Sequence, residues 1–170
     1  MAEAVDPFTA VYQAIQGAIA GWPALAALVA PLNRVDTTLA TFEQFVPDAT
    51  SADRPRLTLL QEGFRCAPAS GNSLSATIEQ DYRVVLLVDT LRTPPLNQIK
   101  YQLLRALLAA GPTLGVAYVE RYTVSDARDA QEKPPRAGPN GGVGSLRWMS
   151  SLLVSVTFYL PRSELINPNV

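Results

Sequence analysis

The sequence predicts an α+β fold in which two amphipathic helices pack on one face of a mostly antiparallel sheet of four, or slightly more, strands. The chain has 170 residues, enough for one substantial core. Two segments show the three- and four-residue spacing of amphipathic helices, and the remaining periodic segments alternate like strands joined by long hairpin loops. The expected order is α-β-β-α-β-β in a single domain, 1–170, with a core at about 6–162.

The first helix is expected to begin at Asp6 and Pro7, because an Asp side chain caps open amides and Pro tolerates the first helical position. Gly21 and Pro23 end it, and a short helix over 24–29 follows before the next proline. The side chains expected to face the sheet recur at helical spacing: Phe8, Val11, Ile15, Ala18, Ile19 and Trp22.

A hairpin follows an irregular stretch at 32–55, which holds a candidate short strand at 41–46. The hairpin consists of a strand at 56–64, a loop at 66–73 and a return strand at 75–91. The return strand contains an apolar run at 84–88, which predicts a central strand covered on both faces at that point.

The second amphipathic helix is expected to open at Thr93, or a neighbour acting as its cap, followed by two prolines, and to close at Gly111 and Pro112. Its inward side chains are expected to be Leu96, Ile99, Leu103, Leu104, Leu107 and Leu108.

Two further strands are expected at 114–124 and 146–160. In the first, alternation places Tyr122 on one face and Val119 on the other. The second should be central to the fold, because seven apolar side chains share one face: Leu146, Trp148, Leu152, Val154, Val156, Phe158 and Leu160.

Pro, Gly and charged residues dominate the connection at 127–144, and the tail at 163–170 is expected to fray. This connection is expected to be flexible, since its composition cannot build a core. One hypothesis makes it an assembly arm that orders against a neighbouring subunit, and the other makes it a plain spacer. The charged side chains that would form the arm are Arg128, Asp129, Glu132, Lys133 and Arg136.

Charge and residue usage exclude several classes of function. A net charge of −1 argues against nucleic-acid binding and leaves little like-charge repulsion between copies. The chain has no histidine, which removes the commonest general base and the usual zinc ligand. Its single cysteine, Cys66, provides neither an intrachain disulfide nor a metal site. We therefore expect a protein that is not an enzyme and uses no cofactor or metal.

We also expect neither a secretory signal nor a membrane-spanning helix. The start, MAEAVDPF, lacks the basic and then apolar run of a secretory signal, and no apolar stretch reaches the roughly 20 residues of a membrane helix. The sequence thus favours a cytoplasmic protein without a membrane partner.

Two motifs offer weaker alternatives. The glycine-rich run at 138–144 leads into a strand and lacks the Gly-Lys-Ser/Thr of a phosphate loop, so a flexible segment is the better interpretation. Glu79 and Asp81 share a strand face, as paired carboxylates of a glycosidase or metal site would. Cross-strand ion pairs with Arg83, Arg121 or Arg147 explain them more simply.

The order of elements resembles the tail terminator, or tail-completion and neck, proteins of tailed bacteriophages. The resemblance covers most of the chain and consists of element order and hydrophobicity, without an invariant signature. The segments that carry it are Val11 to Ile15, Leu25 to Val29, Arg56 to Leu60, Tyr82 to Val88, Leu103 to Leu108 and Leu152 to Phe158. The stretches at 32–55 and 127–144 are long for a minimal member.

The resemblance implies a virion protein, assembled in the bacterial cytoplasm, that forms a homo-oligomeric, hexameric ring at the capsid-proximal end of the tail tube. Such a ring stops tube polymerisation and joins the tail to the head connector, with DNA only passing through its lumen. The implied partners are further copies, the tail tube protein, connector or neck proteins and, in a contractile tail, the sheath.

Two alternatives stay open. One is a head-completion or neck adaptor of the connector, which would follow twelvefold symmetry. The other, from a different class, is a small-ligand-binding or enzymatic α+β domain in which Glu79, Asp81 and strand tyrosines line a pocket.

Overall fold

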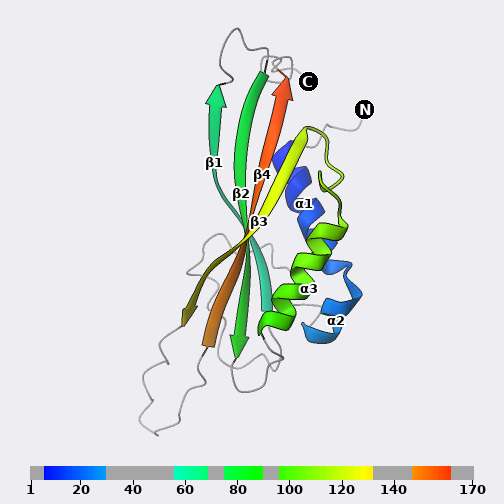
Figure 1. Ribbon diagram of the computed structural model, residues 1–170, viewed down its shortest axis with the longest axis vertical. Coiled ribbons are helices and arrows are strands. Elements are labelled where there is room, and N and C mark those ends of the chain that lie inside the picture. The colour runs from blue at the N-terminus through cyan, green and yellow to red at the C-terminus, as the bar shows by residue number, and fades with distance from the viewer. Residues whose placement is uncertain (1–5, 30–55, 69–74, 90–95, 132–146, 162–170) are drawn as a thin grey trace, which may run out of the picture.

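The computed structural model describes residues 6–29, 56–68, 75–89, 96–131 and 147–161. It confirms the α+β class, with three helices and four strands in these ranges (Figure 1). The elements are α1 (Pro7–Ala20), α2 (Pro23–Leu28), β1 (Arg56–Pro68), β2 (Ser75–Asp89), α3 (Leu96–Ala109), β3 (Val119–Gln131) and β4 (Arg147–Pro161). The expected strand at 41–46 and the expected cap Thr93 lie outside the described residues.

The four strands form one antiparallel sheet in the order β1-β2-β4-β3. Both central positions match the predictions: β2 lies between β1 and β4, and β4 lies between β2 and β3. The long strands twist strongly, and all three helices lie on the same side of the sheet (Figure 1).

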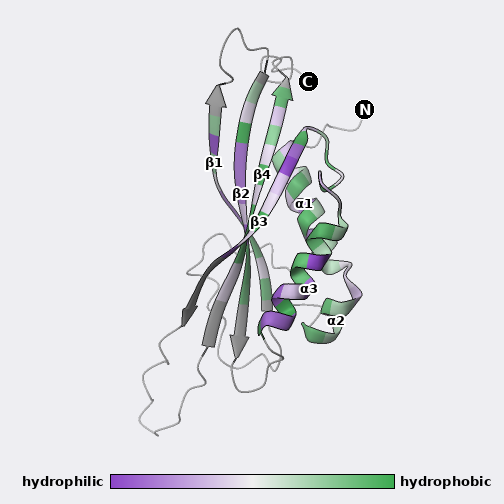
Figure 2. Ribbon diagram, in the orientation of Figure 1, coloured by the Kyte–Doolittle hydropathy of each residue, from purple (hydrophilic) through white to green (hydrophobic). Residues whose placement is uncertain are grey.

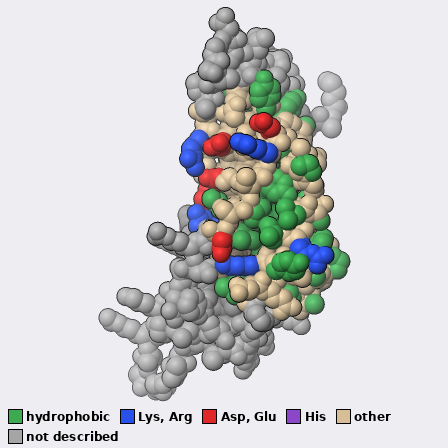
Figure 3. Space-filling model, in the orientation of Figure 1, with side chains coloured by type: hydrophobic (Ala, Val, Ile, Leu, Met, Phe, Trp, Pro, Cys, Tyr) green, Lys and Arg blue, Asp and Glu red, His purple; other side chains and the backbone are tan. Residues whose placement is uncertain are grey.

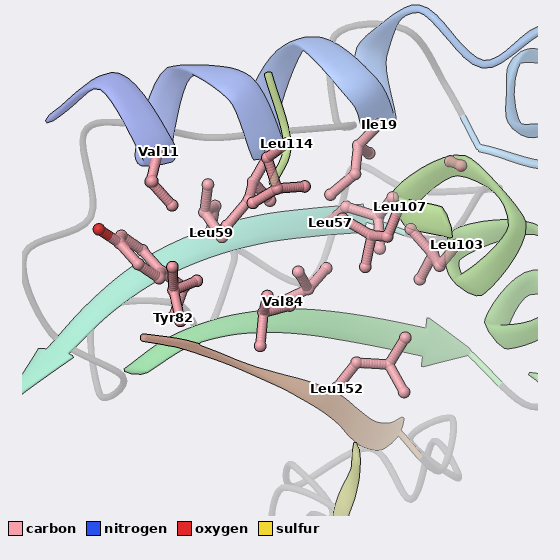
Figure 4. Close-up of a cluster of buried hydrophobic side chains, with 14 of the residues drawn as sticks. Val11, Ile19, Leu57, Leu59, Tyr82, Val84, Leu103, Leu107, Leu114 and Leu152 are labelled. Atoms are coloured by element: carbon pink, nitrogen blue, oxygen red, sulfur yellow. The ribbon is translucent and has the colours of Figure 1, made fainter. Parts of the chain in front are cut away.

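Alternation along the central strands creates the core. On β4, Leu152, Val154 and Phe158 are buried and face the helices, while the intervening residues face the other side. The helices contribute every third or fourth residue to the same cluster, as Val11 and Ile19 of α1 and Leu103 and Leu107 of α3 do (Figure 4). Val84, Val85 and Leu86 are all buried, which confirms the coverage of β2 on both faces.

Asp6 starts α1 as expected. Its Oδ1 accepts a hydrogen bond from the Thr9 amide at 2.9 Å, and Pro7 occupies the first turn. The hydrogen bonds from Thr9 hold the pKa of Asp6 below its ordinary value. The helix ends at Gly21, so both expected boundaries are correct.

Three tyrosine hydroxyls tie the helices to the strands. Tyr82 of β2 donates to the Phe8 carbonyl of α1 at 3.0 Å, and Tyr12 of α1 donates to the Leu59 carbonyl of β1 at 3.2 Å. Tyr122 of β3 donates to the Leu107 carbonyl of α3 at 2.8 Å. These bonds fix the helices along the strands in addition to nonspecific apolar packing.

The start of β3 differs from the prediction. The strand begins at Val119, because 110–118 forms successive turns in which Leu114 and Tyr118 have φ of 54° and 66°. A register shift between Val119 and Arg121 then brings Val119 to the helix side, the same side as Tyr122. The predicted opposition of these two residues is therefore wrong, since simple alternation cannot anticipate a bulge.

Two strand boundaries and the orientation of one side chain are also corrected. Strand β1 continues to Pro68, so Cys66 lies in a strand and is exposed, not in the hairpin loop. Strand β3 continues to Gln131, which makes the first five residues of the expected 127–144 loop part of the sheet. Leu108, expected to point inward, is 59% exposed, because it lies on the side of α3 opposite the buried Leu103.

Candidate interaction surfaces

The side of the sheet that faces away from the helices carries most of the charge that the structure describes. We call its charged part, together with two neighbouring side chains, the polar sheet face. It contains three arginines and three carboxylates, so its charges balance. Its members are Glu62, Arg65, Glu79, Asp81, Arg83, Arg121, Ser155 and Tyr159.

Asp81 is engaged in structural contacts. Its Oδ1 accepts a hydrogen bond from the Ser155 hydroxyl at 2.6 Å, and its Oδ2 lies 3.6 Å from the Arg65 guanidinium. Arg83 pairs with Glu62 at 2.5 Å. Asp81 thus forms a cross-strand ion pair, but with Arg65 and not with the expected arginines, and Arg83 pairs with Glu62 instead.

Glu79 shares the face with Asp81, as predicted from their spacing, but it is exposed and does not converge with it on a common partner. Arg65 stands opposite Glu79 in the strand register and yet turns to Asp81. No cation of the described residues forms an ion pair with Glu79. This arrangement gives no support to a pocket built around the two carboxylates.

Metal ligation and membrane insertion find no support in the described part of the chain. Within these ranges, no three His, Cys, Asp or Glu residues are grouped so that they could hold a metal ion. None of the described helices is long and apolar enough to cross a membrane.

The helical side of the molecule has the opposite character. Helices α1 and α2 contain no charged residue, and α3 contains only Lys100 and Arg105. Lys100 pairs with Asp126 of β3 at 2.9 Å. Arg105 forms no ion pair with any carboxylate that the structure describes. Figure 3 shows the contrast, with apolar side chains spread over the helices and charged ones gathered mainly over the strands, and Figure 2 shows it by residue hydropathy.

Arg105 makes cation–π contacts with two aromatic rings. Its guanidinium carbon is 5.6 Å from the centre of the Trp22 ring and 5.8 Å from that of Tyr101. The Trp22 Nε1 donates to the Gln102 side-chain oxygen at 3.0 Å, which fixes the indole against α3. Tyr101 and Leu108 lie about two turns apart on the same side of α3, with Arg105 between them along the helix, and are 58% and 59% exposed. We call Trp22, Tyr101, Arg105 and Leu108 the helical patch.

The sheet also has two edges, since β1 and β3 each pair on one side only among the described strands. Strand β1 is bulged between Gln61 and Phe64, where Gln80 of β2, only 1% exposed, donates to the Glu62 carbonyl. Beyond the bulge, Phe64 is 63% exposed and contacts the Phe8 ring at 6.0 Å. Bulges interrupt the regular row of free backbone groups that would otherwise pair with any strand.

The residues of the hypothesised assembly arm are only partly described. Arg128 and Asp129 belong to β3, within the shifted register between Ala127 and Ala130. Glu132, Lys133 and Arg136 lie outside the described residues. The arm therefore stays a hypothesis for the part of the connection beyond Gln131.

Sequence reasoning missed the helical patch. It assigned Trp22 to the core side of α1 and Leu108 to the core side of α3, whereas Trp22 is half-buried and Leu108 is exposed. One signal was available: across 34 helical residues there is no acidic side chain, which is unusual for a surface that only meets water.

Compared with models of protein families and with curated proteins, the chain matches none of them.

Proposed function

We propose that the chain is a structural subunit that assembles into a ring in the neck of a tailed-phage virion, where it ends the tail tube and joins it to the head connector. This function follows the resemblance of element order to tail terminators. The described residues contain no grouped metal ligands, and Asp81 is held by Ser155 and Arg65, so the surfaces favour protein contacts over chemistry.

One observation carries the proposal most directly: the two broad surfaces of the subunit are unlike each other. The helical side is almost uncharged, whereas the opposite side of the sheet carries balanced charges. A ring requires a heterologous contact, in which one surface of a subunit meets a different surface of the next. A near-neutral chain opposes such contacts only weakly.

The second candidate is a head-completion or neck adaptor protein, which needs the same kind of contact and differs in the number of subunits. A ring on the tail tube would be hexameric, and an adaptor on the connector would follow twelvefold symmetry. Subunit number therefore separates the two candidates.

Native mass spectrometry of the purified chain, alone and with the tail tube protein of the same phage or prophage, tests the proposal. A hexamer that forms alone or on the tube ends supports the terminator, and a twelvefold ring supports the adaptor. A chain that remains monomeric in both samples and leaves tube length unchanged would contradict both.

A further inference from the structure

The helical patch has the composition of the centre of a protein interface. Such centres are depleted of charge and enriched in Trp, Tyr and Arg, which also dominate binding energy. Here a Trp, a Tyr and an Arg lie together on a helical layer whose other charge, Lys100, is already paired with Asp126.

The patch is also held in place before any partner arrives. The bond from Trp22 to Gln102 fixes one ring, and the cation–π contacts of Arg105 with Trp22 and Tyr101 restrict the guanidinium. Binding there would cost less side-chain entropy than ordering free side chains. The described carboxylates form no ion pair with this guanidinium, so its N–H groups remain available to an acid of a partner.

The positive charge of Arg105 limits which surface can bind the helical patch. Two helical layers packed back to back would bring two Arg105 side chains together without a free acid, because α1, α2 and α3 contain no carboxylate and Asp126 of β3 is already paired with Lys100 of α3. The partner surface must therefore differ from the helical layer and present an acid. Glu79 meets this need, since it is exposed and pairs with no cation of the described residues.

The surroundings of Glu79 also complement the patch. Glu79 stands opposite Thr157, and Tyr159 stands opposite Thr77, so Glu79 and Tyr159 are near neighbours on the polar sheet face. Tyr159 is 51% exposed and provides an aromatic surface beside the acid. The polar sheet face thus offers a carboxylate beside an exposed ring, and the helical patch offers a cation beside two rings, so the two surfaces are complementary in charge and in aromatic character.

We infer that the helical patch of one subunit docks on the polar sheet face of a second copy, with Arg105 of one meeting Glu79 of the next. This inference rests on the proposed ring and names the two surfaces that form it. The helices lie on one side of the sheet and Glu79 on the other, so the two docking surfaces lie on opposite sides of each subunit, the arrangement that head-to-tail assembly requires (Figure 1).

Charge reversal tests the contact in purified full-length protein. Sedimentation velocity over a wide concentration range would compare wild type with Arg105→Glu, with Glu79→Arg and with the double variant. Each single reversal should raise the concentration of half-assembly at least about tenfold, as loss of a central interface contact does. The double variant should assemble nearly as wild type.

Mixing the two single variants gives a sharper result. An Arg105→Glu subunit keeps Glu79, and a Glu79→Arg subunit keeps Arg105, so each surface of one variant complements a surface of the other. An equimolar mixture should assemble although neither variant does so alone. Glu120→Arg is the matched control, because Glu120 is also exposed but lies at the bulge of the edge strand β3. It should leave assembly unchanged, and equal melting temperatures would show that all variants fold.

The outcomes separate this inference from the proposed function. If the wild-type chain is monomeric alone, the same variants are compared in the presence of tube protein, and a wild-type chain that is monomeric there as well overturns both the inference and the proposed function. Oligomers that persist in both folded single variants also overturn it and place the subunit contact elsewhere, while the ring proposal stands. Loss of assembly in both variants without recovery in the mixture counts against direct pairing of Arg105 with Glu79.

Discussion

The two sides of the same sheet are built by the same alternation and yet serve different ends. On the helix side, Tyr82, Val154 and Phe158 are fully buried, and tyrosine hydroxyls fix the packing to backbone carbonyls. On the other side, Arg65, Asp81 and neighbouring charges pair near the surface, where ion pairs contribute little stability. The difference teaches that the large apolar core lies on the helix side, whereas the other side combines a small buried area around Val85 with paired surface charges.

Adjacent residues of β4 provide the strongest test of this contrast. Phe158→Ala removes a fully buried ring and should lower the free energy of unfolding by about 3–5 kcal/mol. Tyr159→Ala, on the opposite side and 51% exposed, should change it by less than about 0.5 kcal/mol. Guanidinium unfolding of both variants checks the pair, and equal losses would mean that the sides are not distinct in stability.

The bulge of β1 offers a second test, at a polar residue inside the helix-side layer. Gln80 donates to the Glu62 carbonyl at 2.5 Å and to the Asp81 carbonyl at 3.0 Å. Gln80→Leu should cost about 1–3 kcal/mol, because the bulge carbonyl loses its buried donor. Gln61→Leu, at an exposed position beside the same bulge, is the control and should be nearly neutral. Similar melting temperatures for the two variants would refute the role of Gln80.

Substitution of Asp6, the N-cap of α1, tests how much an exposed charge on the helix side contributes to the free energy of unfolding. Asp6→Ala should lower the free energy of unfolding by about 1 kcal/mol at neutral pH, and Asp6→Asn should retain most of the cap. Bonding to Thr9 lowers the pKa of Asp6, so its contribution is present above the ordinary pKa of 3.8 and is lost as pH falls through the lower folded value. Stability against pH for the Asn variant should lack that acid decrease.

Tyr82 tests the loss of a single buried hydroxyl, with an effect similar to that of the cap. Tyr82→Phe should lower the free energy of unfolding by about 0.5–1.5 kcal/mol at pH 7, through loss of its bond to Phe8. Burial, with a smaller effect from the charge of Asp6, raises the pKa of Tyr82 above its ordinary value of 10.0. The wild-type advantage is therefore full below pH 10.0 and declines above it, as the unfolded chain ionises first. If the difference in the free energy of unfolding between wild type and Tyr82→Phe widened at alkaline pH, this account would be contradicted. Tyr101→Phe, at an exposed ring, is the control.

Much of the fold follows from periodicity in the sequence. The cap at Asp6, the apolar run around Val85 and the alternation at Val154 depend on local rules, and the structure confirms each. The start of β3 does not follow from such rules. Leu114 and Tyr118 adopt left-handed backbone conformations that their side chains disfavour, so the turns there depend on tertiary packing.

The candidate surfaces were harder to foresee than the core. Glu79 and Asp81 could be placed on one face from their spacing, but the partners Arg65 and Ser155 come from strands whose register the sequence leaves open. The stacking of Arg105 on Trp22 joins residues 83 positions apart, and only the packing of α3 beside the end of α1 brings them together.

The central place of β4 has a consequence for how the chain folds during synthesis. Strands β1 and β2 can pair as soon as both are made, and α1 can cover them, whereas β3 pairs only with β4, the last strand in the described order. A nascent chain that has reached β3 therefore exposes one free edge of β2 and both edges of β3 until β4 enters between them. Such exposed edges invite pairing with other chains. Completion of the sheet is thus a late, nonlocal event, and we expect folding to be slower than in domains whose strands pair in sequence order.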